Sequence, residues 1–593
     1  MRKIMFLAAS LLLSISSFAE IVSFDKATEV AEKVLGTTSV NYVWNGSNDL
    51  KSSNSAPAFY VYTGNGRWAV ISADDCATPV LMHGQGEFNP DNIPENMRAL
   101  LKDIELNIIK ARSSNFYTTP EIEAKWTAVS TDSSNALYAA LETIVENEDH
   151  ERTALWNQGE TYNSSCPTFE GKPCYAGCSA TAMAIIMRFF KWPETGKGRI
   201  EEYTTTTHKM TIPAIVLDGY KYDWSKMPVT DANTVGNWNE DQIKAVADLM
   251  YHCGAAVQMD YTPNGSGAVL SKMLDAMIRN MSYSASAMEY IRINFSNRQW
   301  FQMIKAEIDA NRPFIYAGFD TKGAGGHAFV CDGYNSDNEI HINWGWGGEE
   351  NAWYAVCYLG GNINYTFSSD DVAIFGLTPD KTGESQPITR LDVYSGVPGG
   401  ISVTSGTVEK GSEFTIQISS IINSGYATFN GNVRAALFDK SGNIKEFISD
   451  KKEYNNLGRY QYYQISKAAT KLTFNCKIKE NLEVGDYISI VYSTEVPDKW
   501  KAVGRYEDGA SSITQYPVFD ITLLDIPYTF HTGEICYPNI MTRKIPNTIQ
   551  WYVDGTELTA EYIRMTSGSH TFKVVLTYND GTKETIIRKV TVK

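Results

Sequence analysis

The sequence predicts a multidomain α+β protein in which a long N-terminal part mixes helices and strands and the C-terminal part consists of strands. Three observations lead to this prediction. The 593 residues are too many for a single hydrophobic core. As far as residue 378, apolar residues recur at helical spacing in some segments and alternate in others. Beyond a linker at 378–387, the patterns are those of strands and tight turns.

The first 19 residues have the pattern of a signal peptide. Two basic residues precede the apolar run 4–13, and Ser17-Phe18-Ala19, with small residues at 17 and 19, provides a cleavage site before Glu20. We therefore expect the protein to be exported and to be secreted, periplasmic or held at the cell surface. No later apolar run approaches the ~20 residues that span a bilayer, so we expect no transmembrane segment.

Residues 20–112 are predicted to form a compact unit of helices and a hairpin. Apolar residues at 27–35 have helical spacing and Gly36 ends that helix. Two strand-like runs flank Gly64-Asn65-Gly66, a strong hairpin signal. The following stretch, 113–137, is rich in Ser, Thr, Asn and Asp, so we expect an exposed linker that proteases can cut.

Cys178 is the first candidate for a catalytic role. It precedes a run of good helix formers, 180–191, that ends at Trp192-Pro193. At a helix N-terminus, unpaired N–H groups and the helix dipole favour an anion and lower the pKa of a thiol. The alternative for a lone cysteine is a small buried apolar residue.

A thiolate nucleophile needs an imidazole nearby, and His327 is the candidate. It follows two glycines and directly precedes a strand-like run, 328–334. His341, in another alternating strand, is its competitor. His327 is preferred because its separation of 149 residues from Cys178 fits the span of papain-like cysteine enzymes.

Four separated motifs resemble the streptopain family of secreted bacterial cysteine proteases, and they occur in the order of that family. They are Leu155-Trp156-Asn157-Gln158-Gly159, Ala176-Gly177-Cys178-Ser179-Ala180, Gly325-Gly326-His327-Ala328-Phe329 and His341-Ile342-Asn343-Trp344-Gly345-Trp346-Gly347-Gly348. The resemblance covers about residues 151–378 and implies a papain-like peptidase domain at 138–378.

The resemblance also implies roles for five residues. Cys178 would be the nucleophile and His327 the general base and acid. Gln158 and the backbone N–H of Cys178 would hold the oxyanion, and Asn343 with Trp344 would orient and shield the imidazole. Without the resemblance, Gln158 is an ordinary polar residue, and Asn343-Trp344 is a polar turn with a core aromatic.

The segment 259–268 resembles a family segment that lines the substrate cleft. Its glycines would let an extended peptide lie against the backbone, so we expect Ser266 and Gly267 to bind substrate. Gly326, directly before His327, is the third residue expected to bind substrate. By itself this segment predicts only a turn.

The segment 66–75 resembles the inhibitory prodomain of the same family. Residues 20–137 are therefore expected to be a prodomain plus cleavable linker. The alternative is an unrelated α+β accessory domain.

Strand patterns and turn signals such as Ser441-Gly442-Asn443 and Asp554-Gly555 fill the C-terminal part. We expect two β-sandwich modules, 388–527 and 528–593, which resemble bacterial immunoglobulin-like appendages. Spacing, adhesion and positioning of substrate remain open as their roles.

Composition excludes some classes of function. The net charge of −16 argues against nucleic acid as a partner. The eight histidines form no cluster at metal-ligand spacing, so we expect no metal and no cofactor. The nine scattered cysteines do not indicate a disulfide scaffold, and Cys166–Cys174 is the one pairing worth considering.

The predicted function is a secreted cysteine endopeptidase that is made as a zymogen. It would hydrolyse protein or peptide substrates through a Cys-His pair and an acyl-enzyme, with its own prodomain as intramolecular inhibitor. The alternatives are a non-catalytic binding or adhesion protein on a papain-like fold, and an amidase or transferase that uses the same site.

Overall fold

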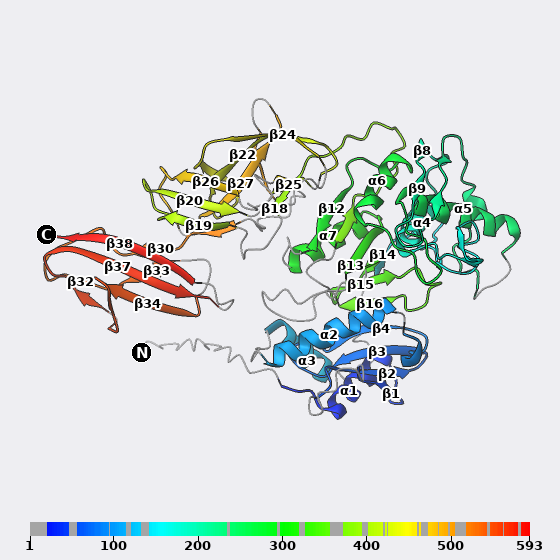
Figure 1. The fold of residues 1–593 in the computed structure, drawn as a ribbon. Helices are drawn as coiled ribbons and strands as arrows, with labels where there is room; N and C mark the ends of the chain where they lie inside the picture. Colours follow the sequence, from blue (N-terminus) through cyan, green and yellow to red (C-terminus); the bar gives the residue numbers. More distant parts are fainter. Residues whose placement is uncertain are drawn as a thin grey trace, which may run out of the picture. The chain divides into compact units, whose positions relative to one another are not determined.

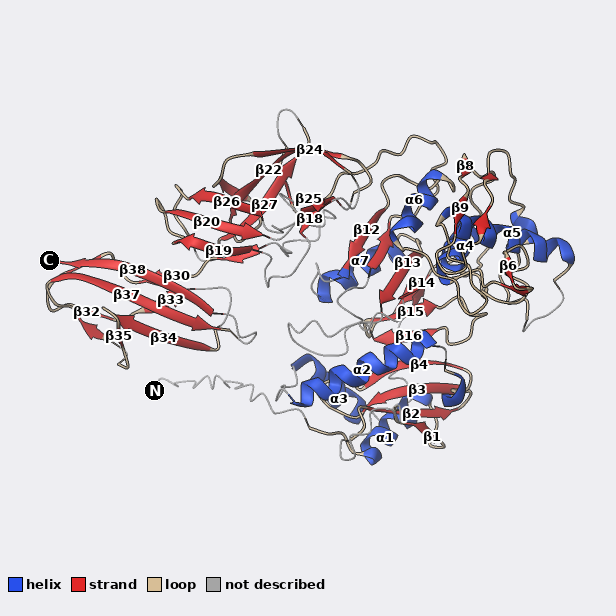
Figure 2. Cartoon of the chain, viewed as in Figure 1, coloured by secondary structure: helices blue, strands red, loops and turns tan. Residues whose placement is uncertain are grey.

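The computed structural model divides the chain into two compact units, Met1–Gln386 and Pro387–Lys593. It describes residues 20–46, 56–93, 95–113, 120–131, 142–233, 238–292, 297–319, 326–355, 372–393, 401–418, 421–423, 425–458, 462–463, 472–483, 485–495, 499–503, 518–541, 546–560, 562–578 and 583–593. In the described residues the first unit mixes helices with strands and the second contains strands (Figure 2). This confirms the α+β class with a β-rich C-terminal part. The predicted signal peptide lies outside the described residues.

The N-terminal part of the first unit is one end of a larger sheet, covered by helices (Figure 1). Its elements are α1 (Phe24–Leu35), β1 (Asn41–Trp44), β2 (Phe59–Gly64), β3 (Arg67–Ser72), β4 (Val80–Gln85), the 3-10 helix η2 (Pro90–Asn92), α2 (Glu95–Ser113) and α3 (Pro120–Thr131). Ser23 caps α1 by accepting from the N–H of Lys26, and Gly36 ends the helix with a φ of 65°. Asn65 and Gly66 both have positive φ, as a two-residue turn between β2 and β3 requires. The predicted helix and hairpin are thus confirmed.

The expectation of an exposed linker throughout 113–137 is wrong for its middle. Residues 120–131 form α3, which buries Ile122, Trp126 and Val129 against the core that α1 also contacts. The indole N–H of Trp126 donates to the carbonyl of Ala77 at 2.8 Å. Polar composition concealed these three apolar residues, which recur every three or four positions. The flanking stretches 114–119 and 132–137 of the predicted linker lie outside the described residues.

The remainder of the first unit packs helices against a second part of the same sheet. Its elements are β5 (Thr143–Ile144), β6 (Thr168–Phe169), β7 (Lys172–Pro173), α4 (Cys178–Phe190), β8 (Arg199–Ile200), β9 (Tyr203–Thr204), β10 (Thr211–Ile212), β11 (Ile215–Val216), the 3-10 helix η3 (Trp224–Lys226), α5 (Glu240–Ala256), α6 (Ser271–Arg279), β12 (Met288–Ile291), α7 (Asn297–Asp309), β13 (Phe314–Phe319), β14 (Gly326–Tyr334), β15 (Glu339–Asn343), β16 (Ala352–Ala355) and β17 (Val372–Phe375). α4 is the central helix of this part, since it contacts both α5 and β14 and is buried along nearly its whole length.

One 11-stranded sheet runs through both parts of this unit, in the order β1-β2-β3-β4-β16-β15-β14-β13-β17-β12, with β5 paired to β14. The junction is the antiparallel pair β4–β16 (Figure 1). In this pair His83 lies opposite Trp353. A Cβ on Gly84 would lie 2.9 Å from the Cβ of Ala352, so only glycine allows this close approach. His83 Nε2 lies 2.9 Å from Glu339 Oε2, and both side chains are buried.

In its described residues the second unit holds two large hydrophobic cores and a smaller cluster of Ala436, Phe438, Tyr487 and Val491. Its strands are β18 (Leu391–Val393), β19 (Ile401–Gly406), β20 (Glu413–Ile418), β21 (Ile421–Asn423), β22 (Phe429–Phe438), β23 (Ile444–Phe447), β24 (Lys452–Leu457), β25 (Tyr462–Tyr463), β26 (Leu472–Lys477), β27 (Tyr487–Ser493), β28 (Lys501–Ala502), β29 (Val518–Asp520), β30 (Leu523–Asp525), β31 (Thr529–Phe530), β32 (Ile535–Cys536), β33 (Asn539–Met541), β34 (Thr548–Val553), β35 (Thr556–Glu557), β36 (Ile563–Arg564), β37 (Gly568–Thr577) and β38 (Lys583–Val592). One core comprises buried residues from Leu391 to Ile521, and the other comprises residues from Leu524 to Val592.

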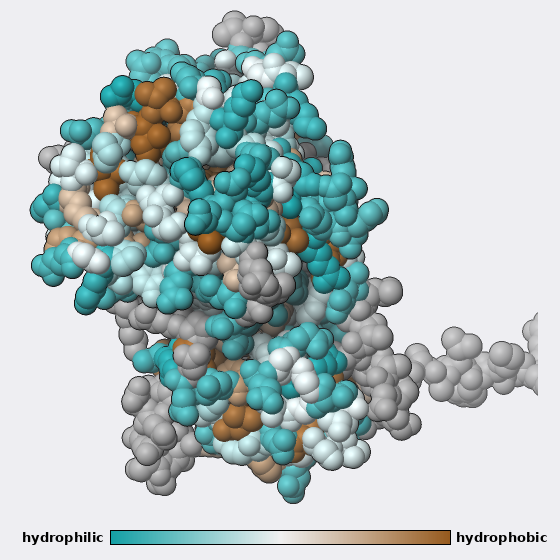
Figure 3. Space-filling view, turned by 90° about the vertical axis from the view of Figure 1, so that its right-hand side faces the viewer, coloured by the Kyte–Doolittle hydropathy of each residue, from teal (hydrophilic) through white to brown (hydrophobic). Residues whose placement is uncertain are grey.

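The surface drawn in Figure 3 is mainly hydrophilic, and its hydrophobic areas are small and separate. Isolated exposed apolar residues of this kind are normal for a folded protein. None of the helices in the described part of the chain combines the length and apolar character that crossing a bilayer requires. Cys166 and Cys174, the pairing considered from the sequence, are both free thiols.

The buried pair at the β4–β16 junction leads to a stability prediction. His83→Ala leaves the carboxylate of Glu339 buried without this partner, a loss that typically costs about 3–5 kcal/mol. We expect the urea midpoint of the first unit, followed by tryptophan fluorescence, to fall clearly. His150→Ala is the control, because His150 also pairs with a glutamate, Glu146, but its side chain is 87% exposed. Equal midpoints for the two variants would contradict the structural role of His83.

Candidate active site

Cys178 is the first residue of α4, and the chain in front of it leaves no room for a larger residue. Gly177 is the N-cap, with a φ of 89°. A Cβ there would lie 2.7 Å from the side chain of Met259 and 3.1 Å from the carbonyl oxygen of Ser266. Glycine is therefore required both by its backbone conformation and by close packing. The thiol stands at the positive end of the helix dipole, as the sequence predicted.

His327 lies near the start of β14, beside the N-terminus of α4. Its side chain is buried, and its Nε2 lies 3.1 Å from the carbonyl oxygen of Trp344. A carbonyl oxygen only accepts, so Nε2 carries the proton and donates it. The other ring nitrogen, Nδ1, is left to contact the thiol of Cys178, with which the ring shares a hydrogen bond.

The surroundings of Cys178 favour its thiolate. Burial alone would raise the pKa of the thiol, but several interactions outweigh it. The charge of the His327 ring, its hydrogen bond and the backbone N–H of Ala328 together lower the pKa from 9.0 to about 7. Burial has the opposite net effect on Cys166, where it raises the pKa to about 12. Cys178 is thus set apart chemically from an ordinary buried cysteine.

Aromatic rings enclose the imidazole of His327. The ring of Trp346 lies 5.1 Å from it and that of Trp344 lies 5.9 Å away, centroid to centroid. The two indoles stack on each other at 5.1 Å with an interplanar angle of 5°. The sequence identified Trp344 as a shielding residue and missed Trp346. Both tryptophans lie in the Gly-rich segment directly after β15, and their spacing of two within it was the available signal.

The amide of Asn343 holds the backbone that contacts the imidazole. Asn343 is completely buried, and its Nδ2 donates to Thr153 Oγ1 at 3.1 Å and to the carbonyl of Ala154 at 3.0 Å. Its Oδ1 accepts from the N–H of Gly345 at 3.1 Å. The direct partner of His327 is instead the carbonyl of Trp344. Asn343 is therefore connected to His327 through the main chain at Trp344 and Gly345.

The loop that carries Gln158 is tied to both sides of the site. The carbonyl of Gln158 accepts from the N–H of Ala176 at 2.9 Å, two residues before Cys178. The carbonyl of Trp156 accepts from the N–H of Gly347 at 3.0 Å, in the turn that follows the two indoles. Backbone hydrogen bonds thus place the half-buried Gln158 between the thiol and the histidine sides of the site.

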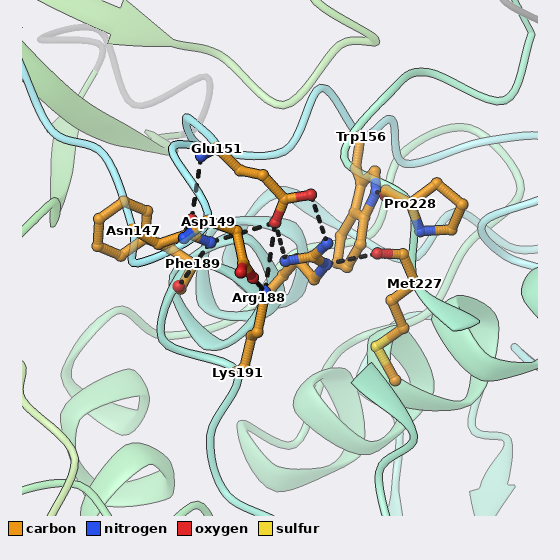
Figure 4. Close-up of polar contacts among 9 residues, drawn as sticks. All are labelled: Asn147, Asp149, Glu151, Trp156, Arg188, Phe189, Lys191, Met227 and Pro228. Carbon is orange, nitrogen blue, oxygen red and sulfur yellow. Dashed lines mark hydrogen bonds and ion pairs between the residues drawn. The ribbon is translucent and has the colours of Figure 1, made fainter. Parts of the chain in front are cut away.

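A cluster of charged residues fixes the opposite end of α4 to the segment that leads into this loop (Figure 4). The guanidinium of Arg188 donates to both carboxylate oxygens of Glu151, at 3.1 and 3.3 Å, and its Nε donates to the carbonyl of Met227. Lys191 pairs with Asp149 and lies 3.6 Å from Glu151. Because this bidentate pair is only partly exposed, it holds the entry to the Gln158 loop against the helix that carries Cys178.

Two segments next to Cys178 and His327 carry the three residues expected to bind substrate. The carbonyl oxygen of Ser266 lies against Gly177, since a Cβ at Gly177 would be 3.1 Å from it. Gly267 is exposed and exchanges two backbone hydrogen bonds with Asp260, at 2.8 and 3.3 Å. Gly326 is the exposed residue immediately before His327. The structure thus places Ser266 beside Gly177 and Gly326 beside His327, and Gly267 follows Ser266 in the chain.

His341, the competing histidine, has another partner. Its Nδ1 lies 2.6 Å from Asp332 Oδ1, and its ring packs edge-on against Trp353 at 5.1 Å. Cys178 shares its hydrogen bond with His327. Among the described residues, no group of three or more His, Cys, Asp or Glu side chains could hold a metal ion.

Comparison with known proteins relates this site to one protease family. The model of the Peptidase C10 family matches residues 156–354. The thiol protease/hemagglutinin PrtT of Porphyromonas gingivalis is 32% identical over 321 residues, which are 52% of this chain and 35% of PrtT. Streptopain of Streptococcus pyogenes is 28% identical over 360 residues, 56% of this chain and 82% of streptopain. The chain thus spans about a third of PrtT and most of streptopain.

Two solved structures are also similar. A fragment of prointerpain A of Prevotella intermedia shares 29% identity, covers 56% of this chain and 99% of its own, and has a TM-score of 0.45. Active interpain A of the same organism shares 30% identity over 41% of this chain and 98% of its own, with a TM-score of 0.35.

The lowered pKa of Cys178 gives a prediction for its reactivity. Alkylation by iodoacetamide needs the thiolate, which is populated above the pKa and lost as the pH falls through it. The rate for Cys178, followed by mass spectrometry, should therefore rise around pH 7 rather than around 9.0. In His327→Ala the rise should move toward 9.0. Cys253 is the internal control, because burial raises its pKa and closes it to the reagent. A rise near 9.0 in the wild type would contradict the proposed pairing.

Proposed function

The chain belongs to the streptopain family of cysteine proteases, the Peptidase C10 family, and we propose that it hydrolyses peptide bonds with Cys178 as nucleophile and His327 as general base and acid. The observation that carries this assignment is the hydrogen-bonded Cys178–His327 pair, in which the thiol has a pKa of about 7 at a helix N-terminus. A non-catalytic binding protein has no need of such a thiol. An amidase or transferase shares the site and differs in the acceptor of the acyl group.

The proposed reaction has two steps. The thiolate of Cys178 attacks the scissile carbonyl, and the protonated His327 ring gives its proton to the leaving amine, which leaves an acyl-enzyme. The imidazole then takes a proton from water, and the resulting hydroxide releases the acid and regenerates the thiol. The backbone N–H of Cys178 and the side chain of Gln158 are the proposed donors to the oxyanion.

Trp344 and Asn343 keep the imidazole in place during both steps. The carbonyl of Trp344 fixes the tautomer with the proton on Nε2, so Nδ1 exchanges protons with the thiol and the substrate. The indoles of Trp344 and Trp346 cover the ring and exclude water from it. An extended peptide would bind along Ser266, Gly267 and Gly326 through backbone contacts.

We further propose that the protein is a zymogen and that residues 20–131, followed by a cleavable stretch, form its inhibitory prodomain. Support comes from the sheet junction, where Met82 lies opposite Tyr354. The hydroxyl of Tyr354 accepts from the indole N–H of Trp344 at 2.8 Å. The proposed prodomain therefore contacts Tyr354, and Tyr354 contacts Trp344, the residue that holds His327. Removal of the prodomain would alter the position of the imidazole.

The ends of the chain complete the proposal. The signal-like N-terminus would direct export to a secreted, periplasmic or cell-surface location. The two cores of the second unit would be immunoglobulin-like β-sandwich modules that space the enzyme from a surface or position its substrates. Protein or peptide substrates and the prodomain are the proposed partners.

Activity tests the assignment of the pair. Cys178→Ala and His327→Ala should each lower kcat/KM on a denatured protein substrate by a factor on the order of 10⁶, because the two residues act as a unit. Cys536→Ala, which removes a free thiol from the second unit, should retain full activity. Unchanged hydrolysis by Cys178→Ala would eliminate the enzyme assignment.

Processing tests the zymogen. The full-length precursor should hydrolyse a small peptide far more slowly than protein cut in the stretch 132–137. Cys178→Ala should accumulate as uncut precursor if the enzyme makes that cut itself. A catalytic amount of the processed wild type should then cut the Cys178→Ala precursor in trans. If the precursor and the processed form hydrolyse the small peptide at equal rates, residues 20–131 are an accessory domain and not an inhibitor.

A further inference from the structure

The peptide group between Trp344 and Gly345 is held from both of its sides. Its carbonyl oxygen accepts from Nε2 of His327 at 3.1 Å, and its N–H donates to Oδ1 of Asn343 at 3.1 Å. In a planar trans peptide the two groups point in opposite directions. A hydrogen bond on the N–H also polarises the carbonyl and improves it as an acceptor. The orientation of the Asn343 amide therefore decides how well His327 is held.

Thr153 determines that orientation. Nδ2 of Asn343 donates to the hydroxyl oxygen of Thr153 and to the carbonyl of Ala154, so the amide cannot turn without losing both bonds. The hydroxyl of Thr153 donates in its turn to Oδ2 of Asp332. A carboxylate only accepts, so it forces the threonine proton toward itself and the threonine lone pair toward Asn343.

Asp332 reaches Thr153 because of an irregularity in the sheet. The β14–β15 register shifts between Cys331 and Gly333, which leaves Asp332 as the extra residue of a bulge. Its backbone carbonyl accepts from the N–H of Val145 at 3.0 Å, and its second carboxylate oxygen lies 2.6 Å from Nδ1 of His341. Both oxygens of this carboxylate are therefore engaged.

The whole relay is shielded from water. The exposed fractions are 2% for Asp332, 4% for Thr153 and 0% for Asn343. Bonds among buried polar groups are stronger than in water, and losing one partner leaves the next group unsatisfied. A change at Asp332 is therefore transmitted through Thr153 to Asn343.

We propose that Asp332 and Thr153 are positioning residues for His327, which act through Asn343 and the Trp344–Gly345 peptide group. This inference rests on the proposed function, because it assigns them to the orientation of the imidazole. Neither residue touches Cys178 or the scissile bond in this scheme. Their effect is to keep Nδ1 of His327 aimed at the thiol.

The test compares Thr153→Val with Thr153→Ser. Valine has nearly the shape of threonine but no hydroxyl, so the relay is cut. We expect kcat to fall by up to about 10²-fold with KM nearly unchanged, as for other small misplacements of a catalytic group. Serine retains the hydroxyl and should restore most of kcat. Asp332→Asn should resemble Thr153→Val, because an amide can present its N–H and reverse the direction of the relay.

Thr522→Val is the matched control. Thr522 is also buried, and its hydroxyl donates to a carboxylate oxygen of Glu584 at 3.1 Å, but it belongs to the second unit. It should leave kcat unchanged. If Asp332→Asn proves to be unfolded by circular dichroism, the Thr153 pair of variants decides alone.

A second measurement does not depend on turnover. The pH at which Cys178 becomes alkylated should rise from about 7 toward 9.0 in Thr153→Val and stay near 7 in Thr153→Ser. A wild-type protein that cleaves no peptide but shows this difference would refute the proposed function and leave the positioning intact. Wild-type kcat and alkylation in Thr153→Val, or equal losses in the valine and serine variants, would overturn the inference.

Discussion

The site depends on one hydrogen bond, from Nε2 of His327 to the carbonyl of Trp344. It selects the tautomer that leaves Nδ1 for Cys178, and the resulting pair accounts for the lowered pKa of a thiol that burial alone would protonate. The carbonyl in this bond belongs to a strand end that Asn343 anchors and two stacked indoles cover. The chemistry at Cys178 is thus supported mainly from β14 and β15, and α4 contributes the helix terminus.

The sheet joins the proposed prodomain to this support. Strand β16 pairs with β4 on one side and with β15 on the other, so the strand that ends in Asn343 lies two positions from the prodomain edge. The buried His83–Glu339 pair reinforces the same junction. An inhibitor built as a continuation of the enzyme's own sheet gains main-chain hydrogen bonds along its edge.

The sequence alone determined the local features. Cys178 at a helix N-terminus followed from the run of helix formers and the Pro that ends it. The β2–β3 hairpin followed from Gly64-Asn65-Gly66, and α1 followed from its apolar spacing and Gly36. The choice of His327 over His341 came from chain separation and motif order. The helix terminus, the hairpin and α1 are fixed by interactions between neighbours in the chain, which is why a pattern sufficed for them.

The tertiary structure decided whatever depends on distant partners. α3 forms because Trp126 finds a place against Ala77, which its polar flanks do not indicate. Asn343 acts on His327 through a peptide group, and Asp332 reaches Thr153 only because a bulge turns it there. These contacts join residues up to 190 positions apart. Sequence patterns record which face a residue occupies, whereas the partner it meets there is set by how the strands and loops pack.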